Sequence, residues 1–319
     1  MIKPITGTFF EFDHHSRAEG KYYNEAMWAF TEEQWRAKVR ETAELGMDTL
    51  VLMASALYFE SYFKFDEFPY SSKLACPNAM EVLLDEADKT GQRIFLSAGF
   101  FGDWVQPQVN TTDPEVINRS LKAMNVISEQ YGHHSCIEGW YMPDEWAIEG
   151  HFDDRFIKYI NTISAEARRL NKKNKTIIGP YGTRITKPDD LYVKQLESMD
   201  LDIIAYQDEV GVQKTRVEEE AAFYEALYKA HEKAGRAKIW ADMEVFDFEG
   251  PVYTSALIPA KWERVKAQME ALSPFVEKII IYAYQGMMTK PGGIARCGYP
   301  EEAERLYTDY KNWLDSLKK

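Results

Sequence analysis

Two glutamates stand where strand-like segments end, and aromatic residues lie close to each. Glu145 closes the stretch GWYMPDE at 139–145, and Glu244 closes KIWADME at 238–244. Cleavage of a glycosidic bond uses two carboxyl groups that flank one sugar, one as proton donor and the other as nucleophile or base. The pair therefore predicts glycosidase chemistry, with Glu145 as acid/base and Glu244 as nucleophile.

The neighbours of Glu145 favour the acid role. Trp140, Tyr141 and Trp146 surround it in sequence, and aromatic surroundings raise the pKa of a carboxyl group. Asp144 is the other choice for the acid, although Glu145 has the longer reach. We expect Asp144 and Trp146 to contact substrate. The competing interpretation is a structural acid at a helix N-terminus or in an ion pair.

Strand alternation places Trp240, Asp242 and Glu244 on one face of their segment. If that face is the interior of a barrel, Glu244 lies at the mouth and Asp242 one layer below, within reach of substrate. The alternative is a buried carboxylate paired with an arginine such as Arg184 or Arg296.

Further polar residues follow two other strand-like segments. Tyr206, Gln207 and Asp208 stand where they could bind sugar hydroxyls or orient the nucleophile, and a loop-capping role is equally compatible with the sequence. Tyr284 is a candidate hydrogen-bond donor to Glu244, against the stronger alternative of core packing.

Aromatic and histidine side chains complete the candidate site. Trp104 lies in a loop after a strand, where an indole ring could pack against a sugar. His14 and His15 follow the first strand-like segment, and His14 could contact substrate. Adjacent histidines are expected to point in different directions and lack metal-type spacing, so no metal and no cofactor is predicted.

Eight strand-like segments alternate with eight helical segments, which favours a closed parallel α/β barrel in one domain over 1–319. The longest connections follow strands, at the end where barrel enzymes build their sites. The strands are expected at 4–11, 47–54, 92–98, 136–142, 175–181, 201–206, 237–243 and 277–284. The helices are expected at 32–45, 78–90, 114–131, 154–171, 188–198, 216–234, 260–273 and 300–317.

Local signals mark the helix ends. Thr31 with Gln34, and Thr112 with Glu115, have capping-box spacing. Pro114 and Pro188 suit a first turn, where a missing N–H costs little. Four glycines that follow helices fit a left-handed position after the last turn; they are Gly46, Gly91, Gly132 and Gly235.

Composition limits the partners. The 38 Lys and Arg against 51 Asp and Glu give a net charge of −13, which argues against nucleic acid and anionic membrane surfaces. No apolar run of about 18 residues is present, and the stretch MIKPI at 1–5 does not have the apolar pattern of a secretory leader. We expect a cytoplasmic protein as the sequence stands, or a secreted or periplasmic one if a leader was trimmed; the oligomeric state stays open.

Several of these segments resemble a bacterial family of glycosidase-like TIM barrels named as a domain of unknown function (DUF4434-type). The similar stretches are PITGTF at 4–9, LGMDTL at 45–50, GWYMPDE at 139–145, YQD at 206–208 and WADME at 240–244. The resemblance implies a barrel similar to the retaining glycoside hydrolases of clan A. In that clan the acid/base follows strand four, matching Glu145, and the nucleophile ends strand seven, matching Glu244. Asn usually precedes the acid/base there, whereas this chain has Asp144.

We therefore expect a retaining glycoside hydrolase acting on an oligo- or polysaccharide. Two alternatives remain at this stage: a non-catalytic carbohydrate-binding barrel, and a metal-assisted sugar isomerase or lyase. The histidine distribution argues against the metal-assisted one.

Overall fold

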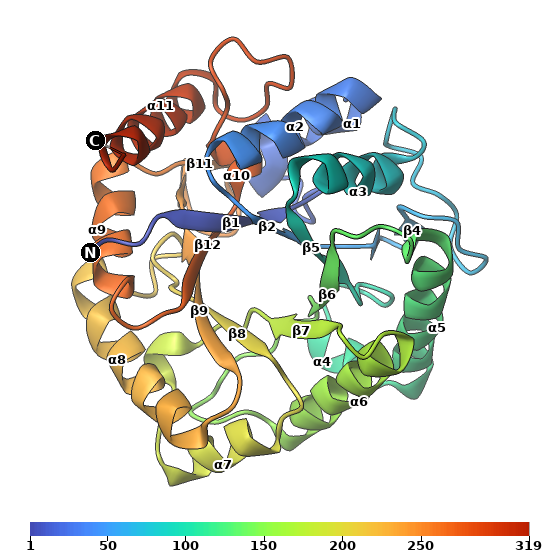
Figure 1. Ribbon diagram of the computed structural model, residues 1–319, viewed down its shortest axis with the longest axis vertical. Helices are drawn as coiled ribbons and strands as arrows, with labels where there is room; N and C mark the ends of the chain where they lie inside the picture. The colour runs from blue at the N-terminus through green and yellow to red at the C-terminus, as the bar shows by residue number, and fades with distance from the viewer. Residues whose placement is uncertain (319) are drawn as a thin grey trace.

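A computed structural model describes residues 1–318, and its centre is a closed barrel of eight parallel strands. The barrel order is β1-β12-β9-β8-β7-β6-β5-β2, so the predicted eightfold barrel is confirmed. The ring of strands is seen end-on in Figure 1. Its strands are β1 (Ile5–Phe10), β2 (Thr49–Leu52), β5 (Arg93–Ser97), β6 (Ile137–Met142), β7 (Lys175–Ile178), β8 (Ile203–Gln207), β9 (Lys238–Glu244) and β12 (Lys278–Tyr282).

Eight helices surround the barrel, one between each strand and the next and the last after β12 (Figure 1). No helix within residues 1–318 combines the length and the hydropathy needed to cross a bilayer. The eight are α2 (Glu32–Glu44), α3 (Ala79–Thr90), α5 (Pro114–Tyr131), α6 (Asp154–Leu170), α7 (Asp190–Ser198), α8 (Val217–Ala234), α9 (Trp262–Leu272) and α11 (Pro300–Ser316).

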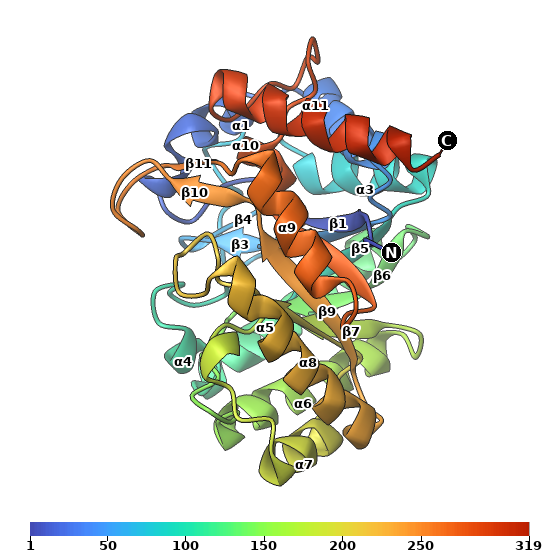
Figure 2. The same ribbon diagram turned by 90° about the vertical axis from the view of Figure 1, so that its left-hand side faces the viewer.

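The long connections after the strands contain the remaining elements. Figure 2 shows the hairpin of β10 and β11 extending beyond the helices. The additional elements are η1 (Glu19–Tyr22), α1 (Asn24–Trp28), β3 (Ala56–Leu57), β4 (Glu60–Ser61), α4 (Pro107–Asn110), η2 (Thr183–Ile185), β10 (Phe246–Phe248), β11 (Leu257–Pro259) and α10 (Tyr284–Met287). Most of them lie in the connections that line the site described below.

The helix N-termini agree with the sequence in part. Thr31 and Gln34 form the predicted capping box of α2. The box predicted at Thr112 is wrong, because α5 begins one residue later and Asp113 accepts from the Glu115 N–H. Pro188 likewise precedes the N-cap of α7, which is Asp189.

Three of the four predicted glycine stops are left-handed. Gly46, Gly91 and Gly235 have φ values of 77°, 77° and 61°. Gly132 does not, because it continues the right-handed turn of α5 with φ −61°. A different constraint acts at Gly139, where a Cβ atom would lie 1.9 Å from the Lys175 carbonyl oxygen. The close approach of β6 and β7 therefore requires glycine at this position.

Aromatic side chains fill the barrel interior in layers. Near the amino end the rings of Phe95 and Trp240 lie 6.2 Å apart, centroid to centroid. Nearer the carboxyl end Phe9 and Tyr141 make an edge contact at 5.2 Å. The interior below the site is thus a packed core and no pore, which fixes the strand ends that carry the acids.

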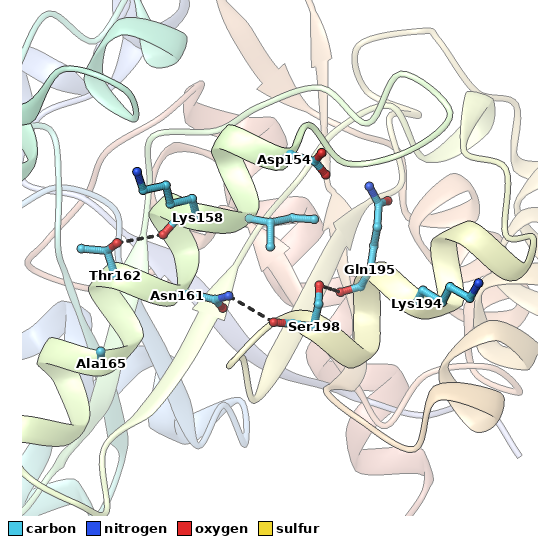
Figure 3. Close-up of a pocket in the computed structure, with 9 residues that line it drawn as sticks. Asp154, Lys158, Asn161, Thr162, Ala165, Lys194, Gln195 and Ser198 are labelled. Atoms are coloured by element: carbon cyan, nitrogen blue, oxygen red, sulfur yellow. Dashed lines mark hydrogen bonds between the residues drawn. The ribbon is translucent and has the colours of Figure 1, made fainter.

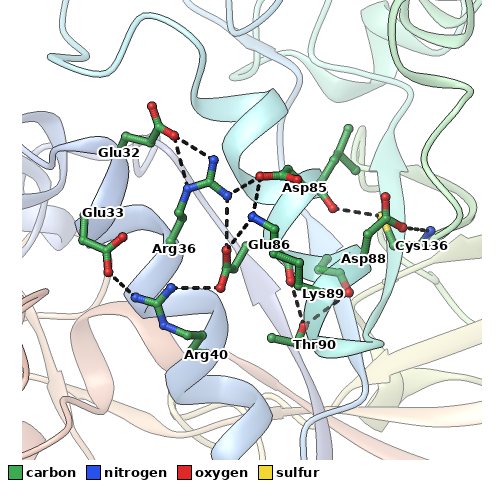
Figure 4. A network of polar contacts seen from close by, with 12 residues as sticks. Glu32, Glu33, Arg36, Arg40, Asp85, Glu86, Asp88, Lys89, Thr90 and Cys136 are labelled. Atoms are coloured by element: carbon green, nitrogen blue, oxygen red, sulfur yellow. Dashed lines mark hydrogen bonds and ion pairs between the residues drawn. The ribbon is translucent and has the colours of Figure 1, made fainter.

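Charged residues join the two helices that precede and follow β2 (Figure 4). On α2, Arg36 donates to Glu32 at 2.7 Å and reaches Glu86 on α3 at 3.1 Å. Arg40 also binds Glu86, at 2.9 Å. Burial raises the pKa of Glu86, but the two guanidinium groups outweigh it and leave that pKa lowered. These ion pairs connect α2 to α3, the two helices that follow the long connections after β1 and β2.

Candidate functional site

A cavity of about 390 Å³ opens at the carboxyl ends of the strands. Its floor includes Glu145 after β6, Asp242 and Glu244 on β9, and Gln207 at the end of β8. The two glutamates that the sequence paired thus face one cavity, although β6 and β9 lie across the barrel from each other (Figure 1). Aromatic rings line its wall: Trp104, Phe246, Phe248 and Tyr253.

Glu145 keeps partial exposure toward this cavity. Burial raises its pKa to about 7, while hydrogen bonds from Gln207 and Tyr141 lower it. The Tyr141 hydroxyl donates to Oε1 at 3.3 Å. A carboxyl group in this state is close to half protonated at neutral pH, so it can both give and take a proton.

Glu244 is held from several sides. Its Oε2 accepts the Val212 N–H at 2.8 Å, and its own N–H donates to Asp208 at 3.1 Å. Within residues 1–318 no lysine or arginine forms an ion pair with its carboxyl group, and Arg296 pairs with Glu304 instead. Burial, followed by the charge of Asp208, raises the pKa of Glu244 well above its usual value.

Asp242 lies below Glu244 on the same face of β9, as strand alternation predicts. It is buried, and its Oδ1 has no hydrogen-bond partner among residues 1–318. Burial and then the charges of Glu145 and Glu244 raise its pKa well above the usual value. Burial thus favours the protonated form of Asp242 over the ionised one.

Asp208 lies behind the cavity wall. One oxygen accepts the Glu244 N–H, and the other accepts the Gln268 amide at 2.7 Å. Burial raises the pKa of Asp208 to about 6. The side chain can orient Glu244, as the sequence suggested, but it does not line the cavity.

Two predicted tyrosines point outward from the barrel. The Tyr206 hydroxyl lies 2.6 Å from that of Tyr192 and 2.9 Å from His231 Nε2. The prediction that Tyr284 donates to Glu244 is wrong, because its hydroxyl donates to Glu41 on α2 at 2.9 Å. Both tyrosines anchor helices to the barrel.

Two neighbours of Glu145 also lie outside the cavity. Asp144 accepts a hydrogen bond from Asn110 at 2.8 Å, and burial raises its pKa to about 7. The Trp146 ring packs 5.7 Å from Phe156 on α6. These contacts position the Glu145 loop, and neither Asp144 nor Trp146 lines the cavity where they were expected to meet substrate.

The sequence missed a polar cluster beside the cavity. His14, which lines the cavity as expected, places Nδ1 3.1 Å from Glu11 and 2.8 Å from the Tyr282 hydroxyl. Its Nε2 lies 3.3 Å from Glu19. Burial lowers the pKa of His14, but Glu11 and Glu19 outweigh it and raise that pKa to about 9. The EFDHH stretch, with an acid three residues before His14, was the available signal.

A larger groove of about 800 Å³ lies between α6 and α7 (Figure 3). Two of its polar side chains are already used locally: Asn161 donates to the Ser198 carbonyl at 3.1 Å, and Gln195 donates to the Phe152 carbonyl at 2.7 Å. No aromatic residue lines it among the described residues. The groove therefore lacks the converging acids and rings of the strand-end cavity.

Comparison with protein families gives one match, which extends over residues 5–295 and is described as a domain of unknown function (DUF4434). The chain belongs to the DUF4434 family. A comparison with curated proteins gives no match.

Solved structures show which fold this DUF4434 protein shares. A candidate alpha-L-fucosidase from Bacteroides thetaiotaomicron matches with a TM-score of 0.77 at 17% identity, covering 98% of this chain and 93% of that one. An endo-1,4-beta-mannanase from Rhizomucor miehei gives 0.63 at 10% identity, over 99% and 95%. The xylanase Xyn10A from Cellvibrio japonicus gives 0.55 at 10% identity, over 97% of each chain. The DUF4434 barrel thus has the fold of TIM-barrel glycosidases.

Proposed function

We propose that this DUF4434 protein is a retaining glycoside hydrolase whose catalytic unit is one domain over residues 1–319. The observation that carries the proposal is the convergence of Glu145 and Glu244 on one aromatic-walled cavity at the carboxyl ends of the strands. Those ends are where barrel enzymes hold their catalytic residues.

The two glutamates have surroundings that suit different roles. Glu145, with its pKa near 7, protonates the leaving oxygen and later deprotonates the attacking water. Glu244 attacks the anomeric carbon. The Val212 N–H favours its ionised form against the burial and the Asp208 charge that raise its pKa, whereas Asp242 below has an oxygen with no partner in the described chain.

Asp208 acts as a positioning residue in this scheme. By accepting the Glu244 N–H and the Gln268 amide, it fixes the end of β9 against α9. Retention requires carboxyl groups about 5–5.5 Å apart, whereas inversion leaves about 6.5–9.5 Å for a water. We propose the shorter spacing.

The proposed substrate is an oligo- or polysaccharide. Trp104, Phe246, Phe248 and Tyr253 offer ring faces on which the C–H faces of a sugar can pack, and Gln207 and Asp242 offer polar groups for hydroxyls. The similar structures are described as acting on different sugars, so we leave the sugar and the linkage to experiment.

The test is a hydrolysis screen with product stereochemistry. Aryl fucosides, mannosides and xylosides, together with plant and bacterial polysaccharides, are offered to the wild type and to Glu244→Gln. NMR follows the first anomer released. We expect turnover by the wild type with retained configuration, and a loss of roughly 10³-fold or more in Glu244→Gln.

Each other outcome changes the proposal. An inverted first product excludes the nucleophile role, and a fully active Glu244→Gln removes that residue from the mechanism. Saturable binding of a sugar without turnover by the wild type supports the non-catalytic carbohydrate-binding barrel instead.

A further inference from the structure

We propose that His14, His15 and Glu19 bind a divalent transition-metal ion, with Zn²⁺ as the reference ion, at the rim of the cavity. One ligand atom from each residue lies within 4.8 Å of the others. All three also line the cavity that contains Glu145 and Glu244. Two imidazoles and one carboxylate form a donor set that binds zinc and leaves one position open.

The spacing of the donor atoms fits such an ion. His14 Nε2 and Glu19 Oε2 are 3.3 Å apart. A tetrahedral zinc about 2.0–2.1 Å from each donor separates neighbouring donor atoms by about 3.3 Å. Both side chains therefore need little movement to bind the same ion.

The surroundings of His14 hold its ring in the orientation that a ligand needs. Nδ1 faces Glu11 at 3.1 Å, and metal-bound histidines commonly donate their other ring N–H to a carboxylate. Nε2 is thereby left to face Glu19 and the cavity. Asn24 holds the backbone, accepting the His14 N–H at 2.8 Å and donating to its carbonyl at 3.1 Å.

His15 completes the set because the chain is irregular at this point. β1 ends at Phe10, so strand alternation no longer separates adjacent side chains, and the two imidazole rings lie 4.3 Å apart. On its other side the His15 ring packs 4.5 Å from Trp104. The expectation that the two histidines point in different directions is therefore wrong.

The cavity offers carboxyl groups and, within residues 1–318, no competing cationic side chain of lysine or arginine. Its lining includes Glu19, Glu145, Asp242 and Glu244, and none of the described residues that line it is lysine or arginine. The open position of an ion at the rim would face this space and could take a water or a sugar hydroxyl. Binding of the ion is independent of the proposed hydrolysis, because it requires neither catalytic glutamate as a ligand.

Calorimetric titration of chelator-treated protein with Zn²⁺ alone tests the site. We expect one ion per chain in the wild type. Removing a ligand in His15→Ala or Glu19→Gln should weaken binding by more than the roughly 10–100-fold that loss of a supporting group costs. Glu11→Gln, which alters only the support of His14, should fall within that range.

The chain offers a matched control. At the amino end of the barrel His134 belongs to two other possible ligand groups, one with Glu81 and His133 and the other with Asp88 and Cys136. His134→Ala should leave the tight Zn²⁺ site unchanged. Metal-free melting curves of every variant report whether the fold is retained.

Three results would overturn the proposal: no Zn²⁺ binding by the wild type, unchanged binding in both His15→Ala and Glu19→Gln, or loss of the tight site in His134→Ala alone. The first would leave His14 as a hydrogen-bonded bridge between Glu11 and Glu19. Glu145→Gln should bind Zn²⁺ like the wild type, so a failure of the hydrolase proposal is read separately from a failure of the metal site.

Discussion

Charged residues at the amino ends of β6 and β9 form ion pairs, whereas the glutamates at the carboxyl ends of these strands form none within residues 1–318. Glu138 is the second residue of β6 and is paired with Lys175, while Glu145 follows the other end of that strand without an ion pair among the described residues. Lys238 begins β9 and lies 2.6 Å from Glu277, while Glu244 ends it unpaired in the same sense.

The consequence lies in protonation. At the amino end, opposite charges meet in ion pairs at the surface. At the carboxyl end, burial raises the pKa of Glu145 to about 7 and that of Glu244 well above its usual value. Ion pairs thus lie at the amino end of the barrel, whereas carboxyl groups without ion pairs lie at the carboxyl end, where they can exchange protons. Burying these carboxyl groups lowers the stability of the folded protein.

The largest predicted effect is a difference in hydrolysis rate between variants of two glutamates near opposite ends of β6. Glu145→Gln should lower the hydrolysis of unactivated glycosides by roughly 10²–10⁴-fold, because the leaving oxygen loses its proton donor. Glu138→Gln, at the amino end of β6, should leave the rate within about twofold. Steady-state kinetics on one substrate measure both variants. Equal losses would show that the two ends do not differ in the proposed way.

The pH profile sharpens the same contrast. A general acid must be protonated, so wild-type activity should fall as the pH rises through about 7, the pKa to which burial raises Glu145. Glu145→Gln should lose this alkaline limb, and Glu138→Gln should keep it. An alkaline limb that persists in Glu145→Gln would assign the titration to another group.

The next effect concerns stability. Glu220 on α8 is fully buried, and neither carboxyl oxygen has a partner among residues 1–318. Burial, followed by the charge of Asp208, raises its pKa to about 10. A carboxyl group whose pKa is higher in the folded protein opposes folding above its unfolded pKa, and the cost grows with pH until the folded pKa. Glu220→Gln should therefore stabilise the protein at pH 7 by about 1–3 kcal/mol.

Chemical denaturation at several pH values measures this gain. The difference between variant and wild type should be small below about pH 4 and should increase toward pH 8. Glu218→Gln changes an exposed residue of the same helix and should leave stability within about 0.5 kcal/mol. A destabilised Glu220→Gln at every pH would mean that the carboxyl group has a favourable structural role.

Periodicity was sufficient to predict the barrel. Each barrel strand lies close to its predicted segment because Gly stops and capping residues punctuate a repeating pattern of apolar runs. The prediction of helix ends was wrong where two neighbouring residues can both cap the same helix. At the start of α5 both Thr112 and Asp113 can cap a helix, and which of them does so depends on where the preceding turn ends.

The site was predictable only where a strand sets the direction of a side chain. Asp242 and Glu244 alternate on β9 and both face the cavity. The same rule places Gln207 inside and its neighbour Tyr206 outside, so the two could not both have faced substrate. His15 lies in an irregular connection, where no period relates sequence to direction.

The smallest predicted effect belongs to the pair at the start of β9. The side chains of Lys238 and Glu277 are 61% and 50% exposed, so water screens their attraction and both lose rotamer freedom on pairing. Lys238→Met should change the free energy of unfolding by less than about 0.5 kcal/mol, and 0.5 M salt should reduce even that difference. Denaturant titration at two salt concentrations measures it. A loss of several kcal/mol would mean that the amino end is held by its ion pairs, whereas a near-zero value leaves the packed rings of Phe95 and Trp240 as the source of its rigidity.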